Sequence, residues 1–154
     1  MKIRIHNIHG AISAILFLIS FSIGVISVFL NSVFIGIFDL LFIAAAFIVV
    51  AVVYCSKCRC REHCNHIFIG WLSVLLSKKN ETPYNAFDIV AGLTPLFAAI
   101  AFQQFWLIEN QILLICFWVA LLSGGLEAYL FVCNKCRNYA CKMCRNKIIV
   151  LNHD

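Results

Sequence analysis

Residues 9–54 contain two apolar runs, HGAISAILFLISFSIGVISVFL and VFIGIFDLLFIAAAFIVVAVVY, separated only by Asn31 and Ser32. A helix needs about 20 mostly apolar residues to cross the hydrocarbon core of a bilayer. Each run reaches that length, and the two-residue break leaves no room for a long connection. We therefore expect an antiparallel hairpin of two membrane-spanning helices, over residues 9–30 and 33–54.

The second half of the chain repeats this pattern, with apolar runs over residues 86–106 and 112–132 joined by a short turn. None of the four runs contains Lys or Arg, and only 12% of all residues are charged while 63% are hydrophobic. Soluble domains carry about 25% charged residues. The first run is too long for a signal peptide and lacks a small-residue cleavage site. The sequence predicts one all-α integral membrane domain over residues 1–154, a four-helix transmembrane bundle solvated by the lipid bilayer.

The basic residues indicate an orientation for this bundle. All twelve Lys and Arg lie on one side of the predicted spans. They are Lys2, Arg4, Lys57, Arg59, Arg61, Lys78, Lys79, Lys135, Arg137, Lys142, Arg145 and Lys147. Cytoplasmic loops carry such an excess of positive charge. We therefore expect a multi-pass protein of the cell membrane with both termini in the cytoplasm.

Each predicted span has one face of small or polar residues. Small residues let helices approach closely in lipid, so these faces should point into the bundle. The faces are Ser13, Ser20, Gly24 and Ser27; Gly36, Asp39, Ile43 and Ala46; Asp88, Gly92, Pro95, Ala99 and Gln103; and Cys116, Ala120, Ser123 or Gly124, and Glu127.

A fifth apolar segment, residues 67–77, reads IFIGWLSVLLS and is too short to span a bilayer. With Trp71 near its centre, it predicts a helix lying in the headgroup region.

Eight of the nine cysteines lie in two segments that follow the second and fourth spans. Residues 55–66 read CSKCRCREHCNH and residues 133–144 read CNKCRNYACKMC. Superposed without gaps, both follow the pattern C-x2-C-x4-[CH]-x2-[CH]. The same alignment also superposes the predicted helices with almost no sequence identity, which leaves open a tandem repeat of a two-helix unit. Thiolate and imidazole both ligate zinc, so exchange of Cys and His at equivalent positions is typical of a zinc site.

The predicted metal ligands are Cys55, Cys58, Cys60, His63, Cys64, His66, Cys133, Cys136, Cys141 and Cys144. Two arrangements follow from the spacing. Each segment closes its own four-ligand site, or the two leading C-x2-C pairs form one composite site between the halves. In both arrangements Cys60 and Cys64 are spare ligands.

Other uses of these cysteines stay open. An iron–sulfur cluster could use Cys55, Cys58, Cys60 and Cys64, although the spacing matches neither ferredoxin pattern. The C-x2-C spacing also occurs in redox dithiols. Stable disulfides are disfavoured in the cytoplasm, and simple space filling explains Cys116 but not the two clusters.

Four further residues carry weaker signals. His6 and His9 form a pair spaced by two residues, although histidines are common at membrane interfaces. Asp39 and Glu127 fall within spans, where ionisable groups are costly and suggest function. They could form a cation or proton path, or they could serve as hydrogen-bonding groups between helices.

The sequence contains no nucleotide-binding loop, nucleophile–base pair or haem-attachment motif, so it favours a non-enzymatic role. We expect a protein that binds structural zinc through its cytoplasmic clusters and docks a membrane or cytoplasmic protein partner. The alternatives are an iron–sulfur electron carrier and a metal transporter or metal-handling protein. Nucleic-acid binding is not expected, because no stacking platform accompanies the basic residues. The sequence leaves the oligomeric state open.

Overall fold

The computed structural model describes residues 6–58, 67–78, 82 and 84–133, and the secondary structure in these ranges is entirely helical. The elements are α1 (His6–Asn31), α2 (Val33–Val49), η1 (Val50–Tyr54), η2 (Cys55–Lys57), α3 (Ile67–Leu76), α4 (Ala86–Leu107), α5 (Gln111–Glu127) and η4 (Ala128–Val132). The segments η1 and η4 are π-helical and η2 is a 3₁₀ turn.

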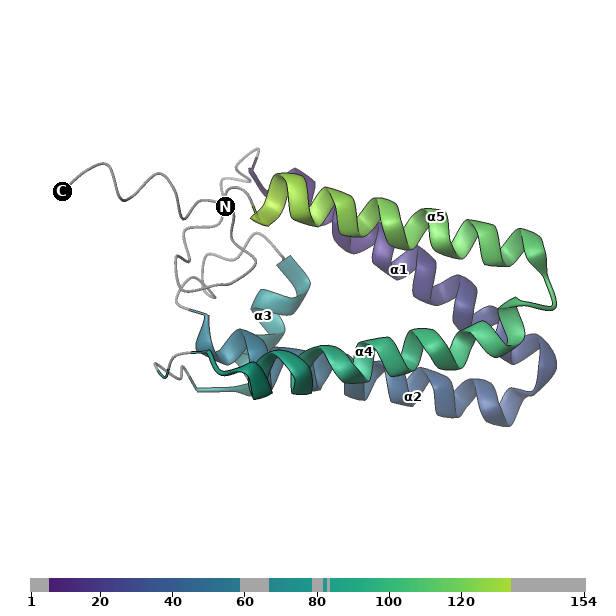
Figure 1. Ribbon diagram of the computed structural model, residues 1–154, viewed down its shortest axis with the longest axis horizontal. Coiled ribbons are helices and arrows are strands. Elements are labelled where there is room, and N and C mark those ends of the chain that lie inside the picture. The colour runs from purple at the N-terminus through teal and green to yellow at the C-terminus, as the bar shows by residue number, and fades with distance from the viewer. Residues whose placement is uncertain (1–5, 59–66, 79–81, 83, 134–154) are drawn as a thin grey trace.

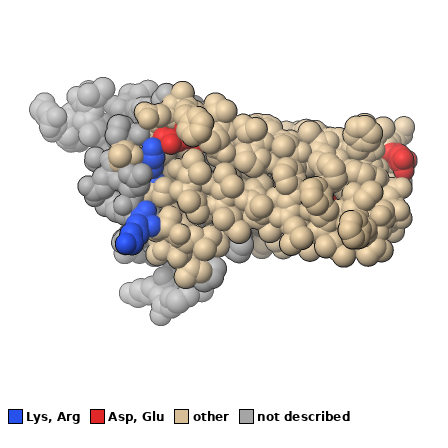
Figure 2. Space-filling model, turned by 90° about the horizontal axis from the view of Figure 1, so that it is seen from below, with Lys and Arg blue, Asp and Glu red and all other residues tan. Residues whose placement is uncertain are grey.

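Four helical stretches are long and apolar enough to cross a membrane. They run over Ile8–Asn31, Val33–Lys57, Ala86–Leu107 and Gln111–Val132, within a few residues of the predicted spans. Large apolar side chains such as Phe34 and Phe105 remain more than four-fifths exposed. On the face drawn in Figure 2 the length of the molecule is free of blue Lys and Arg, which appear only at one end. These features are compatible with a multi-pass membrane protein whose outer surface contacts lipid.

The helices alternate in direction, so the bundle has two different ends. One end, here the Cys end, contains the start of α1, the start of α4, and the segments η2 and η4 that follow α2 and α5. The opposite end, here the turn end, contains the connection at Ser32 and the turn between α4 and α5. Both segments that lead into the cysteine clusters therefore belong to the same end of the bundle (Figure 1).

The four long helices are arranged as two pairs. The most extensive contact is between α1 and α5, while α2 with η1 packs on α4. Helix α1 also contacts α2 and α4, and the core there includes Phe21, Ile43 and Ala99. In Figure 1 the α1–α5 pair and the α2–α4 pair diverge toward the Cys end, where α3 lies between them.

The predicted inward faces are confirmed for α1 and α2, because all eight residues assigned to these two faces are buried. In α4 the face is buried except for Pro95, which is half-buried. In α5 the prediction was wrong at Cys116, which is exposed. Ala120 is buried, and of the two alternatives Ser123 and Gly124 it is Gly124 that is buried.

The buried face of α5 consists of Phe117, Ala120 and Gly124. Two hydrogen bonds from α1 set this orientation. Ser20 Oγ donates to the carbonyl of Phe117 over 3.1 Å, and Ser13 Oγ donates to the carbonyl of Gly124 over 3.0 Å. Neighbouring side chains of a helix point about 100° apart, so Cys116 turns away from α1 once Phe117 faces it.

The predicted short helix is present as α3, and it crosses the Cys end of the bundle (Figure 1). It contacts η1, η2, α1 and α2. Gly70 and Ser73 are buried, whereas Val74, Leu75 and Leu76 are exposed. One side of α3 therefore packs on the bundle and its last turn presents an apolar surface.

Candidate metal centre

The first pair of predicted ligands, Cys55 and Cys58, lies on a tight turn at the end of α2. The backbone leaves its α-helical path at Val50, passes through the π-helical segment, and closes one 3₁₀ turn over Cys55–Lys57. The N–H of Cys58 donates to the carbonyl of Cys55 over 3.1 Å. In 3₁₀ geometry the side chains at i and i+3 eclipse one another. The turn therefore holds the backbone of Cys55 and Cys58 close together, the spacing that a C-x2-C chelate uses, and both side chains are half-buried.

This turn is anchored to α4 through Lys57. Lys57 Nζ lies 2.7 Å from Asp88 Oδ2, and the two side chains are 13% and 11% exposed. Asp88 Oδ2 also accepts the backbone N–H of Asn85 over 2.8 Å, which satisfies a donor at the start of α4. Asp88 is thus an acidic residue in the first turn of α4, where a negative charge stabilises the start of a helix. Because Asp88 already compensates the charge of Lys57, we assign this lysine to anchoring the turn.

The second cluster begins at Cys133, the last described residue of the C-terminal half. It follows η4 directly, has helical φ and ψ of −68° and −32°, and is half-buried. The other predicted ligands lie outside the described residues; they are Cys60, His63, Cys64, His66, Cys136, Cys141 and Cys144. Within the described ranges, no three His, Cys, Asp or Glu side chains are grouped so as to hold a metal ion. The structure therefore places one predicted ligand pair and the start of the second cluster.

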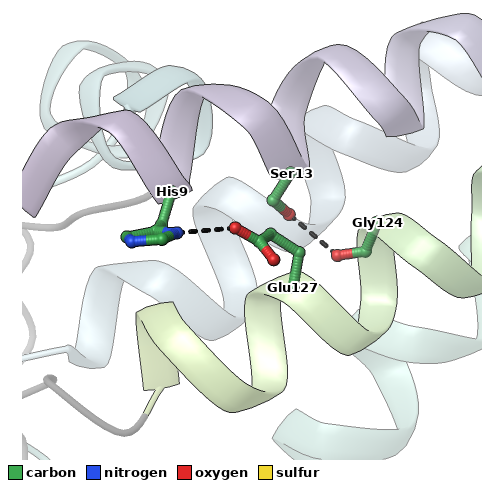
Figure 3. Close-up of polar contacts among 4 residues, drawn as sticks. All are labelled: His9, Ser13, Gly124 and Glu127. Carbon is green, nitrogen blue, oxygen red and sulfur yellow. Dashed lines mark hydrogen bonds and ion pairs between the residues drawn. The ribbon is translucent and has the colours of Figure 1, made fainter.

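His9 is paired with Glu127 rather than simply facing an interface. His9 Nδ1 and Glu127 Oε1 lie 2.6 Å apart, and the two side chains are 32% and 20% exposed. The imidazole also stacks on Phe131, with ring centroids 4.6 Å apart. Figure 3 shows this pair one turn beyond the bond from Ser13 to Gly124, so both contacts join α1 to α5. The side chain of His6, the other member of the predicted pair, lies outside the described residues.

Sequence reasoning missed the pairing of His9 with Glu127. His9 is the first residue of the first predicted span and Glu127 lies five residues before the end of the fourth, so both fall near the Cys end of the predicted bundle. That shared end was an available signal. It could not identify the partners, since the order of helices around the bundle is not encoded in the length of the apolar runs.

Asp39 is paired with Gln103 in the interior of the bundle. Gln103 Nε2 donates to Asp39 Oδ2 over 2.9 Å, and both side chains are completely buried. Gly24 of α1 provides the space for the amide, because a Cβ at Gly24 would lie 2.2 Å from Gln103 Oε1. Asp39 thus joins α2 to α4, whereas Glu127 joins α5 to α1. The structure does not bring these two carboxyl groups together, and each contacts a side chain of a neighbouring helix.

Comparison of the chain with family models, with curated proteins and with solved structures finds no match. The function of the Cys end is therefore argued from the chemistry and placement of its own residues.

Proposed function

We propose that this chain is a multi-pass protein of the cell membrane that holds structural zinc through Cys and His side chains at its cytoplasmic face. The observation that supports the proposal is the turn at Cys55–Cys58, which an i to i+3 backbone hydrogen bond of 3.1 Å closes around the first C-x2-C pair. The positive-inside rule assigns this end of the bundle to the cytoplasm, where thiols are kept reduced and available for metal.

The choice of zinc rests on the mixture of ligand types. The two clusters exchange Cys for His at equivalent positions, and zinc accepts thiolate sulfur and imidazole nitrogen in the same tetrahedral geometry. The anchoring of the turn by Lys57 and Asp88 favours binding further. It orders the backbone around the first two ligands before the ion arrives, so less conformational entropy is lost on binding.

A docking or structural role follows from a zinc site in which all four ligands are protein side chains. Zinc closed by four protein ligands keeps no open position for substrate or water. The segments that contain the remaining ligands are short and largely polar, so they can bury little apolar area of their own. Metal binding would supply the free energy that orders them. The ordered segments would present a basic cytoplasmic surface to a membrane or cytoplasmic protein partner.

Elemental analysis of the anaerobically purified protein, together with its visible absorption spectrum, tests this proposal. We expect a colourless protein with bound zinc. The double substitution C55S/C58S should reduce the zinc content, whereas C116S should retain it because Cys116 lies exposed on α5. Broad brown absorption with stoichiometric iron would instead identify an iron–sulfur protein. Equal zinc content in all three proteins would remove Cys55 and Cys58 from the ligand set.

A further inference from the structure

The helix boundaries of the two halves coincide after a shift of 78 residues, the separation of Asn31 and Glu109. Adding 78 to the first and last residue numbers of α2 gives those of α5, and the same addition takes η1 to η4. Helix α4 falls within the shifted range of α1. Helices of π type are rare and are mostly single-turn features. Their occurrence at equivalent positions, directly before Cys55 and Cys133, is evidence that the two halves are copies of one structural unit.

The contacts between the halves have the arrangement expected of two such units. Helix α1 packs on α5 as α4 packs on α2, and α1 also contacts its own counterpart α4, although α1 contacts α2 more extensively than α4 contacts α5. Two pairs of equivalent residues meet between the halves. Asn31 Nδ2 donates to Glu109 Oε2 over 3.5 Å at the turn end, and Phe21 and Ala99 share the core cluster. The halves are therefore related by an approximate two-fold axis that runs along the bundle between α1 and α4, as in other membrane proteins with parallel repeats.

This axis would place Cys55 and Cys133, the first residues of the two clusters, on opposite sides of the bundle. Helices α1 and α4 flank the axis, while α2 and α5 lie on the outside and make no extensive contact with each other in the described structure. Figure 1 shows the ends of α2 and α5 on opposite sides of α3. The first thiol pair is held to α4 by Lys57 and Asp88, and the end of α5 is held to α1 by His9 and Glu127. The Lys57–Asp88 pair lies within the α2–α4 pair of helices, and the His9–Glu127 pair lies within the α1–α5 pair. Neither contact brings Cys55 and Cys133 closer to each other.

We infer that the chain is a tandem repeat of a two-helix unit and that each unit has its own metal site, one beginning at Cys55 and the other at Cys133. This inference rests on the proposed binding of zinc. A composite site would require thiols from both clusters to lie about 2.3 Å from a single ion. That arrangement would bring the ends of η2 and η4 together, whereas in the described structure each is anchored to a different helix pair.

Zinc stoichiometry of the full-length protein tests the inference. We expect about two equivalents in the wild type, about one in C55S/C58S, about one in C133S/C136S, and none in the quadruple variant. Loss of all zinc in either double variant would indicate a composite site and overturn the inference, while the proposed function would stand. Wild-type protein without zinc would contradict the proposed function itself.

A cross-linking experiment tests the separation of the clusters without metal. In a variant that retains only Cys55 and Cys133, mild oxidation should give no intramolecular disulfide, because Cα atoms more than about 7 Å apart cannot be bridged. The same cysteine-free background with N31C and E109C should be joined by a short bifunctional thiol reagent, because the native side chains meet at their tips, and this shows that the bundle is folded. Rapid cross-linking of Cys55 to Cys133 contradicts separate sites.

Discussion

Lys57, within the turn of Cys55 and Cys58, bridges to Asp88 in the first turn of α4 with only 2.7 Å between Nζ and Oδ2. The contact joins the first predicted metal ligands to a helix of the other half of the chain. Because both side chains are mostly shielded by neighbouring residues, the pair holds the turn in one position relative to the bundle.

The substitution K57M should weaken zinc binding without abolishing it. It leaves the thiols in place but releases the turn from α4, and loss of such supporting contacts costs metal affinity by a factor of about 10. Competition with a chromophoric chelator measures the change. K78M is the matched control, because Lys78 is exposed on the same connecting segment. Equal affinities for the two variants would show that the ion pair does not support the metal site.

The substitution G124V should destabilise the bundle by about 1–3 kcal/mol, the usual cost of inserting atoms into a packed interface. A Cβ at Gly124 would lie 3.1 Å from Leu16 Cβ and 3.4 Å from the carbonyl oxygen of Ser13. The added side chain would push α5 away from α1. Unfolding in detergent micelles measures the loss. G125V should cost less, since a Cβ at Gly125 meets no atom within 4 Å, and equal losses would contradict the close crossing at Gly124.

The substitution Q103A should lower stability by about 1–2 kcal/mol, because it removes the amide that donates to a completely buried carboxyl group. D39N should cost less, since an Asn carbonyl at this position can still accept from Gln103. Q104A is a control at the next position, where the amide bonds instead with Trp118 at an exposed site. A loss for Q104A that equals the loss for Q103A would contradict a special role for the buried pair.

Cysteines introduced by N31C or E109C should react with membrane-impermeant thiol reagents added outside intact cells. Both positions are exposed at the turn end, which the positive-inside rule assigns to the outer face. A cysteine-free background removes competing thiols. K78C should react only after the membrane is permeabilised. Labelling of N31C and E109C from the cytoplasmic side alone would reverse the orientation and make disulfides the better explanation of the clusters.

The lengths and inner faces of the helices could be predicted because they depend on local pattern. An apolar run of sufficient length forms a helix wherever lipid replaces water, since every backbone group must then be satisfied within the segment. Small and polar residues at helical spacing identified Gly36, Asp39, Ile43 and Ala46 as the inner face of α2, and all four are buried. The same reasoning chose Cys116 instead of Phe117 in α5, because a continuous apolar run specifies the direction of its face only to within one residue.

Contacts between distant segments could not be predicted from pattern. His9 and Glu127 are 118 residues apart, and their contact depends on α1 and α5 being neighbours. The same holds for the contact between Lys57 and Asp88. In the sequence, Lys57 is one of several basic residues that flank a span, and Asp88 is an acidic residue near the start of another. The π-helical ends were also unexpected, since no residue preference distinguishes Val50–Tyr54 from an ordinary last helical turn. For the proposed metal site, the sequence predicted the ligands, and the structure added the turn that contains Cys55 and Cys58 and its anchor to α4.

The extensive contact between α1 and α5 has a consequence for biosynthesis. These are the first and the last of the described α-helices, and the bonds from Ser13 and Ser20 reach carbonyls 111 and 97 residues further along the chain. During translation α1 is made long before its main neighbour exists, so its serine hydroxyls must first bond to carbonyls of their own helix. The bundle closes only when α5 leaves the ribosome. A chain that terminates before Gln111 lacks this closing step and is exposed to the quality-control proteases that remove incompletely folded proteins.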